Sequence, residues 1–160
     1  RLTEAQETLS APLVQGIAPR FSKPGYLYEY CVIYGLVLGE LGKVRQMGNM
    51  FLKAIQLAAN GLRDAQKVSM CWSKLFAYTV QHEDWRYLLE AAEQARQFGE
   101  NYEVENLVYW AEEQTAYAQR GLGNRKEAKK TARLILKRYR RARHREKIKE
   151  WKAFIATLKG

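Results

Sequence analysis

Apolar residues recur every three or four positions along most of the chain, which is the period of an amphipathic α-helix. Val44, Met47 and Phe51 begin one such stripe in residues 43–60, and the same spacing returns in residues 144–158. The three prolines all lie within the first 24 residues, so the rest of the chain contains no obligate helix breaker. The pattern therefore predicts an all-α fold.

Short turns separate the apolar stripes. Placing Gly42, Glu83 and Gly123 in register gives a period of about 41 residues, which is typical of stacked helical hairpins. We therefore expect a right-handed α-solenoid of antiparallel hairpins, with about seven to eight helices. The expected segments of this one helical-repeat domain, 1–160, are a half repeat at 2–18, hairpins at 26–60, 63–99 and 102–143, and a basic capping helix at 144–158.

Two of the helix ends have local sequence signals. Asn60 and Gly61 follow an apolar stripe, and this pair predicts a left-handed C-terminal cap for the helix before it. Asn124 precedes the stripe that contains Ala128 and Ala132, and asparagine is a favoured N-cap residue. These signals predict a helix end near residue 60 and a helix start near residue 125.

The three hairpins carry parts of a known repeat pattern. The matching positions are Tyr34-Gly35 with Leu38 in the first, Trp72 and Leu75 in the second, and Gly123-Asn124 with Ala128 and Ala132 in the third. In these positions the chain resembles the tetratricopeptide repeat superfamily over roughly residues 26–137. The proline that ends a standard repeat is missing and the period is longer. The chain is in this respect more similar to long-helix relatives, such as MalT-like transcriptional activators and Rap-type or Rgg-type peptide-pheromone receptors.

The resemblance implies a binding groove. In that superfamily the first helix of each pair lines a concave surface that binds a peptide or a partner helix. Carried over to this chain, the groove positions are Glu29, Met70, Ser73, Trp110, Glu113, Tyr117 and Arg120, with Val32, Leu36 and Ala77 beside them. An aromatic ring there anchors a partner, and the charged side chains set its register.

The charge of the chain is concentrated at its end. From Gly121 onward fifteen Lys and Arg residues face three acids, which leaves twelve cations against fourteen acids before it and a net charge of +10 overall. Such a segment attracts phosphate backbones, but it also suits the solvated outer face of a terminal helix or an anionic membrane surface. The candidate nucleic-acid contacts are Lys137, Arg138, Arg140, Arg141, Arg143 and Arg145.

The sequence contains no recognisable catalytic or metal-binding pattern. His82 and His144 are far apart in the repeat register, and the chain has no glycine-rich phosphate loop. Cys31 and Cys71 fall within expected helices without ligand-like spacing, so we expect buried, inert thiols. We therefore expect neither enzymatic activity, nor a cofactor, nor a metal.

These patterns favour a non-catalytic scaffold or sensor module that binds a protein or peptide. The chain begins with Arg1 rather than Met, so we expect a fragment or a processed product, and the module is expected to be part of a larger regulatory protein. No apolar run is long enough to span a bilayer, and a cytoplasmic location is the default expectation. The alternative function is nucleic-acid binding through the basic C-terminal helices, and self-association through an open end of the stack is a third.

Overall fold

The computed structural model describes residues 3–4, 7 and 23–158, and this part of the chain contains seven α-helices and no β-strand. The prediction of an all-α fold is confirmed. The predicted half repeat at 2–18 lies almost wholly outside the described residues. The chain divides into two compact units, with the boundary in sequence between His82 and Glu83.

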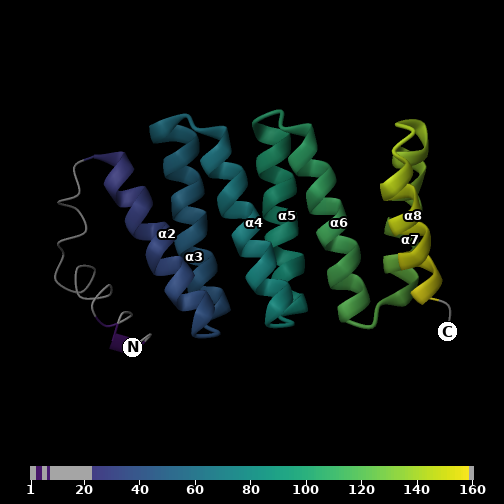
Figure 1. The fold of residues 1–160 in the computed structure, drawn as a ribbon, viewed down its shortest axis with the longest axis horizontal. Coiled ribbons are helices and arrows are strands. Elements are labelled where there is room, and N and C mark those ends of the chain that lie inside the picture. Colours follow the sequence, from purple (N-terminus) through teal and green to yellow (C-terminus); the bar gives the residue numbers. More distant parts are fainter. Residues whose placement is uncertain (1–2, 5–6, 8–22, 159–160) are drawn as a thin grey trace. The chain divides into compact units, whose positions relative to one another are not determined.

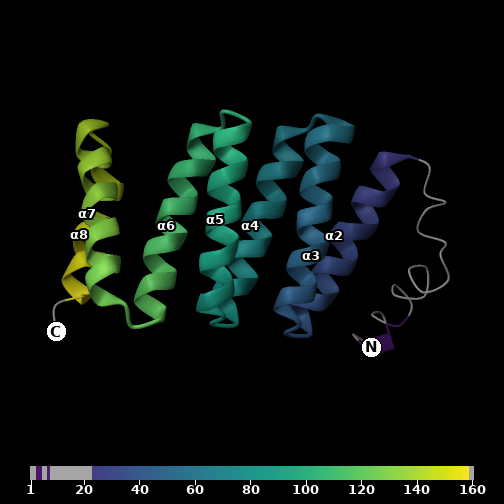
Figure 2. The same cartoon turned by 180° about the vertical axis from the view of Figure 1, so that it is seen from behind.

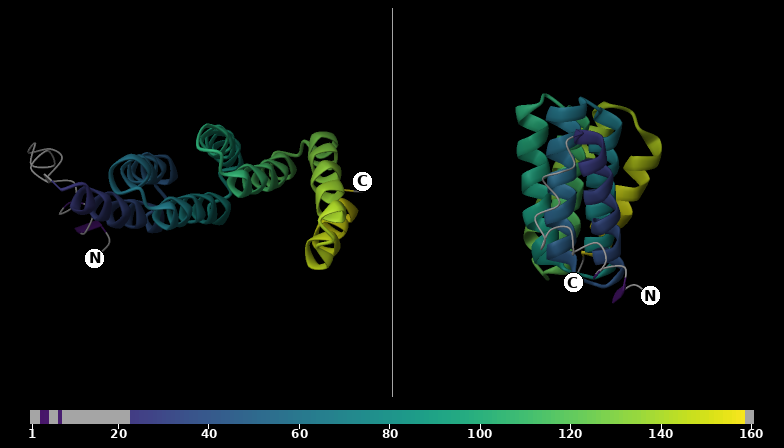
Figure 3. Two further views of the ribbon diagram at one scale, coloured as in Figure 1. Left: turned by 90° about the horizontal axis from the view of Figure 1, so that it is seen from above. Right: turned by 90° about the vertical axis from the view of Figure 1, so that its left-hand side faces the viewer.

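Between residues 23 and 82, the first unit contains three α-helices and one short π-helix. They are α2 (Pro24–Glu40), α3 (Val44–Gln56), η2 (Leu57–Leu62) and α4 (Ala65–Gln81). Pro24 is the first residue of α2. A backbone N–H at this position would have no acceptor within the helix, so the lack of one in proline costs no hydrogen bond. Seen from above, α2 and α4 form one row and α3 packs against them from one side (Figure 3). The core between them includes Phe51, Met47, Trp72 and Leu75.

The second unit contains four α-helices. They are α5 (Trp85–Asn101), α6 (Glu105–Gly121), α7 (Arg125–Arg141) and α8 (Arg145–Thr157). Each helix is joined to the next by a short turn and runs back beside it (Figures 1 and 2). This antiparallel packing of each helix on its neighbour in sequence is the arrangement found in an α-solenoid.

The turns between the helices recur at a regular spacing, which corresponds to one helix together with one turn. A residue with left-handed backbone lies in each turn, at Gly42, Arg63, Glu83, Glu103, Gly123 and Arg143. Successive members of this series are 20 or 21 residues apart. Gly42, Glu83 and Gly123, which define the register in the sequence, are therefore equivalent turn positions. At Gly123 the turn is closed by a hydrogen bond of 2.8 Å from the Asn124 N–H to the Gln119 carbonyl, as in a Schellman motif.

Two of the predicted helix ends differ in detail from the structure. The helix before Asn60 does not stop there but continues as the π-helix η2, and the left-handed residue is Arg63. The wider π-turn is closed by a bond of 2.9 Å from the Asp64 N–H to the Ala58 carbonyl. Asn124 does stand at the N-terminus of α7, but its side chain makes no capping hydrogen bond.

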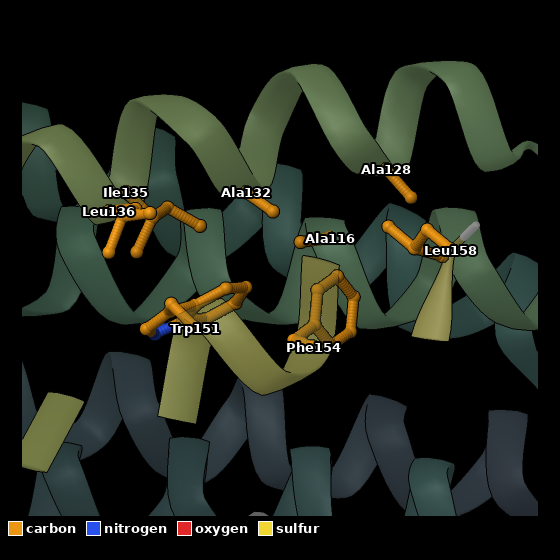
Figure 4. Packing of buried hydrophobic residues seen from close by; sticks show 8 residues of the cluster. All are labelled: Ala116, Ala128, Ala132, Ile135, Leu136, Trp151, Phe154 and Leu158. Carbon is orange, nitrogen blue, oxygen red and sulfur yellow. The ribbon is translucent and has the colours of Figure 1, made fainter. Parts of the chain in front are cut away.

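The core of the second unit joins α6, α7 and α8. Trp151 and Phe154 point from α8 toward α7 and α6, where small alanines leave room for the two rings (Figure 4). Its members are Ala116, Ala128, Ala132, Ile135, Leu136, Trp151, Phe154 and Leu158. Because α8 and its C-cap residue Leu158 supply three of these side chains, α8 is packed as a part of the unit and not as a solvated tail.

Candidate interaction surfaces

The groove residues predicted in the first unit lie on an exposed face. Glu29 on α2 and both Met70 and Ser73 on α4 are all exposed. Ala77, one turn beyond Ser73, is exposed as well, whereas Val32 and Leu36 are half-buried. The structure thus leaves the three principal positions of this unit accessible to a partner.

This face also carries large apolar side chains, of which Met70 alone is among the predicted groove residues. Ile33 is 49% exposed and Met70 is 41% exposed. Tyr26 and Val80, also on α2 and α4, are exposed too. Ile33 lies one helical turn after Glu29. The predicted groove positions include Val32, and moving that position by one residue would have included Ile33 instead.

Contacts between α2 and α4 hold this face together. The Tyr28 hydroxyl lies 3.7 Å from the Cys71 sulfur in the buried contact between the two helices. Near their C-terminal ends the Tyr78 hydroxyl donates a hydrogen bond of 2.5 Å to Glu40, and the Tyr78 ring lies so close to Gly39 that an added Cβ would be 2.9 Å from it. The two exposed faces are therefore presented side by side.

The two cysteines lie beneath this face and not on it. Cys31 and Cys71 are both buried and both free. Burial raises the pKa of each thiol, which disfavours the reactive thiolate at neutral pH.

In the second unit, two of the predicted groove residues make contacts within the chain. Glu113 is only 6% exposed, and its carboxylate accepts hydrogen bonds from the Tyr139 hydroxyl at 2.5 Å and from Lys147 Nζ at 3.3 Å. Tyr117 donates a hydrogen bond of 3.1 Å to Glu150 on α8, and its ring packs on Trp151. These contacts tie α6 to α7 and α8.

The same contacts shift the ionisation of the groups involved. Burial, together with the neighbouring carboxylate of Glu150, raises the pKa of Tyr117 to about 12. Burial and the hydrogen bond to Glu113 raise the pKa of Tyr139 above its ordinary value. Burial on its own would lower the pKa of Lys147, but its bonds to Glu150 and Glu113 raise it. At neutral pH both hydroxyls stay protonated donors and Lys147 stays charged.

The other two predicted residues of this unit lie nearer the surface. Trp110 is half-buried, and Arg120 is exposed. The Arg120 guanidinium lies over the rings of Tyr117 and Phe154, 5.6 Å and 4.8 Å from their centroids. It therefore covers the edge of the contact between α6 and α8.

Most of the predicted basic residues are exposed and available. Lys137, Arg140, Arg141, Arg143 and Arg145 are exposed, and none forms an ion pair with another described residue. Arg138 differs from them. Its guanidinium forms an ion pair of 2.5 Å with Glu112 and lies 3.8 Å from the centroid of the Tyr109 ring. It therefore helps to join α7 to α6.

The basic surface also includes the start of α7, which lies within the segment 125–152 predicted for the alternative function but before the six candidate contacts. A shallow hollow of about 470 Å³ is lined by Lys126, Lys129, Lys130, Arg133 and Leu134. These four cations also lack an ion-pair partner among the described residues. The sequence does indicate this basic surface, because Glu127 is the single acid among the seventeen residues of α7 and leaves most of its cations without a partner on the same helix.

Comparison of the chain with models of known protein families gives no match, and comparison with curated proteins gives none either. In the described part of the chain, no group of three His, Cys, Asp or Glu side chains is placed to hold a metal ion. None of the described helices is both long enough and apolar enough to cross a membrane.

Proposed function

We propose that the chain is a non-catalytic interaction module, similar in kind to tetratricopeptide repeats, that binds a protein or peptide partner on the exposed face of α2 and α4. The observation that supports this proposal is the clustering of exposed apolar side chains. Of seven large hydrophobic residues that are exposed in the described part of the chain, four lie on these two helices, namely Tyr26, Ile33, Met70 and Val80. Exposed apolar side chains that gather on two neighbouring helices are a feature of interaction sites.

The chemistry of the face fits an extended peptide or a helix. Ile33 and Met70 supply apolar area, and methionine adapts to partners of different shape. Glu29 lies one helical turn from Ile33 and is exposed, so it can pair with a cation on the partner. We therefore expect a partner segment with two or three apolar side chains and at least one Lys or Arg. The chain itself would act as a scaffold or as the sensor part of a larger regulatory protein in the cytoplasm.

Selection from a displayed library of random twelve-residue peptides tests this proposal. We expect apolar peptides with one or more cations to be enriched on the wild-type chain, and their affinity to fall at least tenfold in the double variant I33S/M70S, on the order of 1.4 kcal/mol or more. Both side chains are exposed, so the free energy of unfolding should change little.

The matched control is L134S, which removes an exposed apolar side chain from α7. It should leave the affinity for the selected peptides unchanged. The proposal is wrong if no peptide is enriched, or if I33S/M70S and L134S weaken binding equally.

A further inference from the structure

We propose that α7 and the start of α8 form a binding surface for the phosphate backbone of a nucleic-acid duplex. This surface consists of nine cations, all exposed except the half-buried Lys129, namely Lys126, Lys129, Lys130, Arg133, Lys137, Arg140, Arg141, Arg143 and Arg145. It lies in the second unit, whereas the peptide face proposed above lies in the first. The two proposals therefore rest on different residues and can fail independently.

The cations are arranged in a row along one side of α7. Ala128, Ala132 and Ile135 are buried against the rest of the unit, and Lys130 and Lys137 lie on the opposite side of the helix. From Lys126 to Arg141 the row is about 22 Å long at 1.5 Å per residue. A duplex carries one negative charge per about 1.7 Å of its axis, so a duplex segment of this length carries roughly a dozen phosphates, of which the row meets those on the side that faces it.

The charges of this row are not neutralised within the chain. None of the nine cations forms an ion pair with a described residue, and three acids of the neighbouring helices are paired with other cations, whereas Glu127 on α7 and Glu146 on α8 form no ion pair with a described residue. Glu112 is paired with Arg138, and Glu113 and Glu150 are both paired with Lys147. The row therefore keeps its full charge for an external anion.

The composition of the surface favours nucleic acid over an acidic protein. The cores of protein interfaces are poor in Lys and rich in aromatic residues, whereas this surface is mostly Lys and Arg, with Leu134 as its one large exposed hydrophobic residue. The nearby rings are engaged in the fold, since Tyr139 binds Glu113 and Trp151 is buried. Without a free ring for base stacking, contact with a duplex backbone fits better than binding of single strands.

Fluorescence polarisation with a labelled 20-base-pair duplex, at salt concentrations from 50 to 200 mM, tests this proposal. We expect the wild-type chain to bind, with an affinity that falls steeply as salt rises. The variant K126Q/K130Q/R133Q/K137Q should bind at least tenfold more weakly, and its slope of log affinity against log salt should be smaller by about 3 to 4 because each lost phosphate contact contributes about 0.9.

The matched control, K23Q/K53Q/K74Q/R86Q, removes the same amount of charge from exposed positions outside α7 and α8. It should retain the slope and most of the affinity of the wild-type chain. The proposal is overturned if the two variants weaken binding equally, because the effect would then be one of net charge. It is also overturned if the wild-type chain binds poly-glutamate or phosphatidylserine vesicles but not the duplex.

Discussion

Replacing Trp151 by alanine should lower the free energy of unfolding by about 3 to 5 kcal/mol, because the substitution leaves a cavity in the core that joins α6, α7 and α8. The side chain is 0% exposed, and its ring packs against Tyr117 and Phe154. Its indole N–H has no hydrogen-bond acceptor among the described residues. The stabilisation therefore comes from the volume and packing of the ring, and chemical denaturation measures it.

Two comparisons identify the cause of that loss. W151F keeps an aromatic ring and removes the unpaired N–H, so it should cost clearly less than W151A. K152A changes the neighbouring exposed residue and should stay within about 0.5 kcal/mol of the wild-type chain. A loss of under about 1 kcal/mol for W151A would show that α8 does not pack on α6 and α7 as described.

Replacing Gly121 by alanine should destabilise the second unit by about 1 to 3 kcal/mol, although alanine is the better helix former. Gly121 is the last residue of α6, and a Cβ at this position would overlap the indole ring of Trp85 at the start of α5. Helix propensity alone predicts the opposite sign, a gain of roughly 0.5 to 1 kcal/mol. The direction of the change in unfolding free energy therefore decides between clash and propensity.

The double variant W85A/G121A provides the test of mechanism. Without the ring the added methyl group meets no clash, so the cost of G121A should disappear in the W85A background and the two changes should be strongly non-additive. G123A is a useful contrast, because space is open around Gly123 but its φ is +77°. It should cost about 1 kcal/mol in either background. Additive effects of W85A and G121A would contradict the close packing of α5 against the end of α6.

The helices and their register could be predicted from the sequence because they depend on local signals. The apolar period and the turn residues Gly42 and Gly123 are properties of short segments, and both glycines do adopt left-handed backbone. Asn60 and Gly61 gave a misleading local signal, because the left-handed cap residue is Arg63, three residues after Asn60. The π-helix before Arg63 cannot be recognised from the spacing of apolar residues.

The environment of single charged residues could not be predicted in the same way. Glu113 and Arg138 have the appearance of solvated residues on a helix, but their partners lie far away in sequence. Tyr139 and Lys147 reach Glu113 from 26 and 34 residues away. The packing of α6, α7 and α8 determines which carboxylate contacts which cation. The spacing of residues within one helix carries no information on this packing.

We expect the peptide face on α2 and α4 and the basic row on α7 to bind different partners. The most direct measurement titrates a selected peptide and the labelled duplex against three chains, namely the wild type, I33S/M70S and K126Q/K130Q/R133Q/K137Q. We predict that the first variant loses at least tenfold in peptide affinity and keeps its duplex affinity, and that the second does the reverse. If either variant weakens both ligands equally, or if neither variant weakens any, the claim of two separate binding surfaces is wrong.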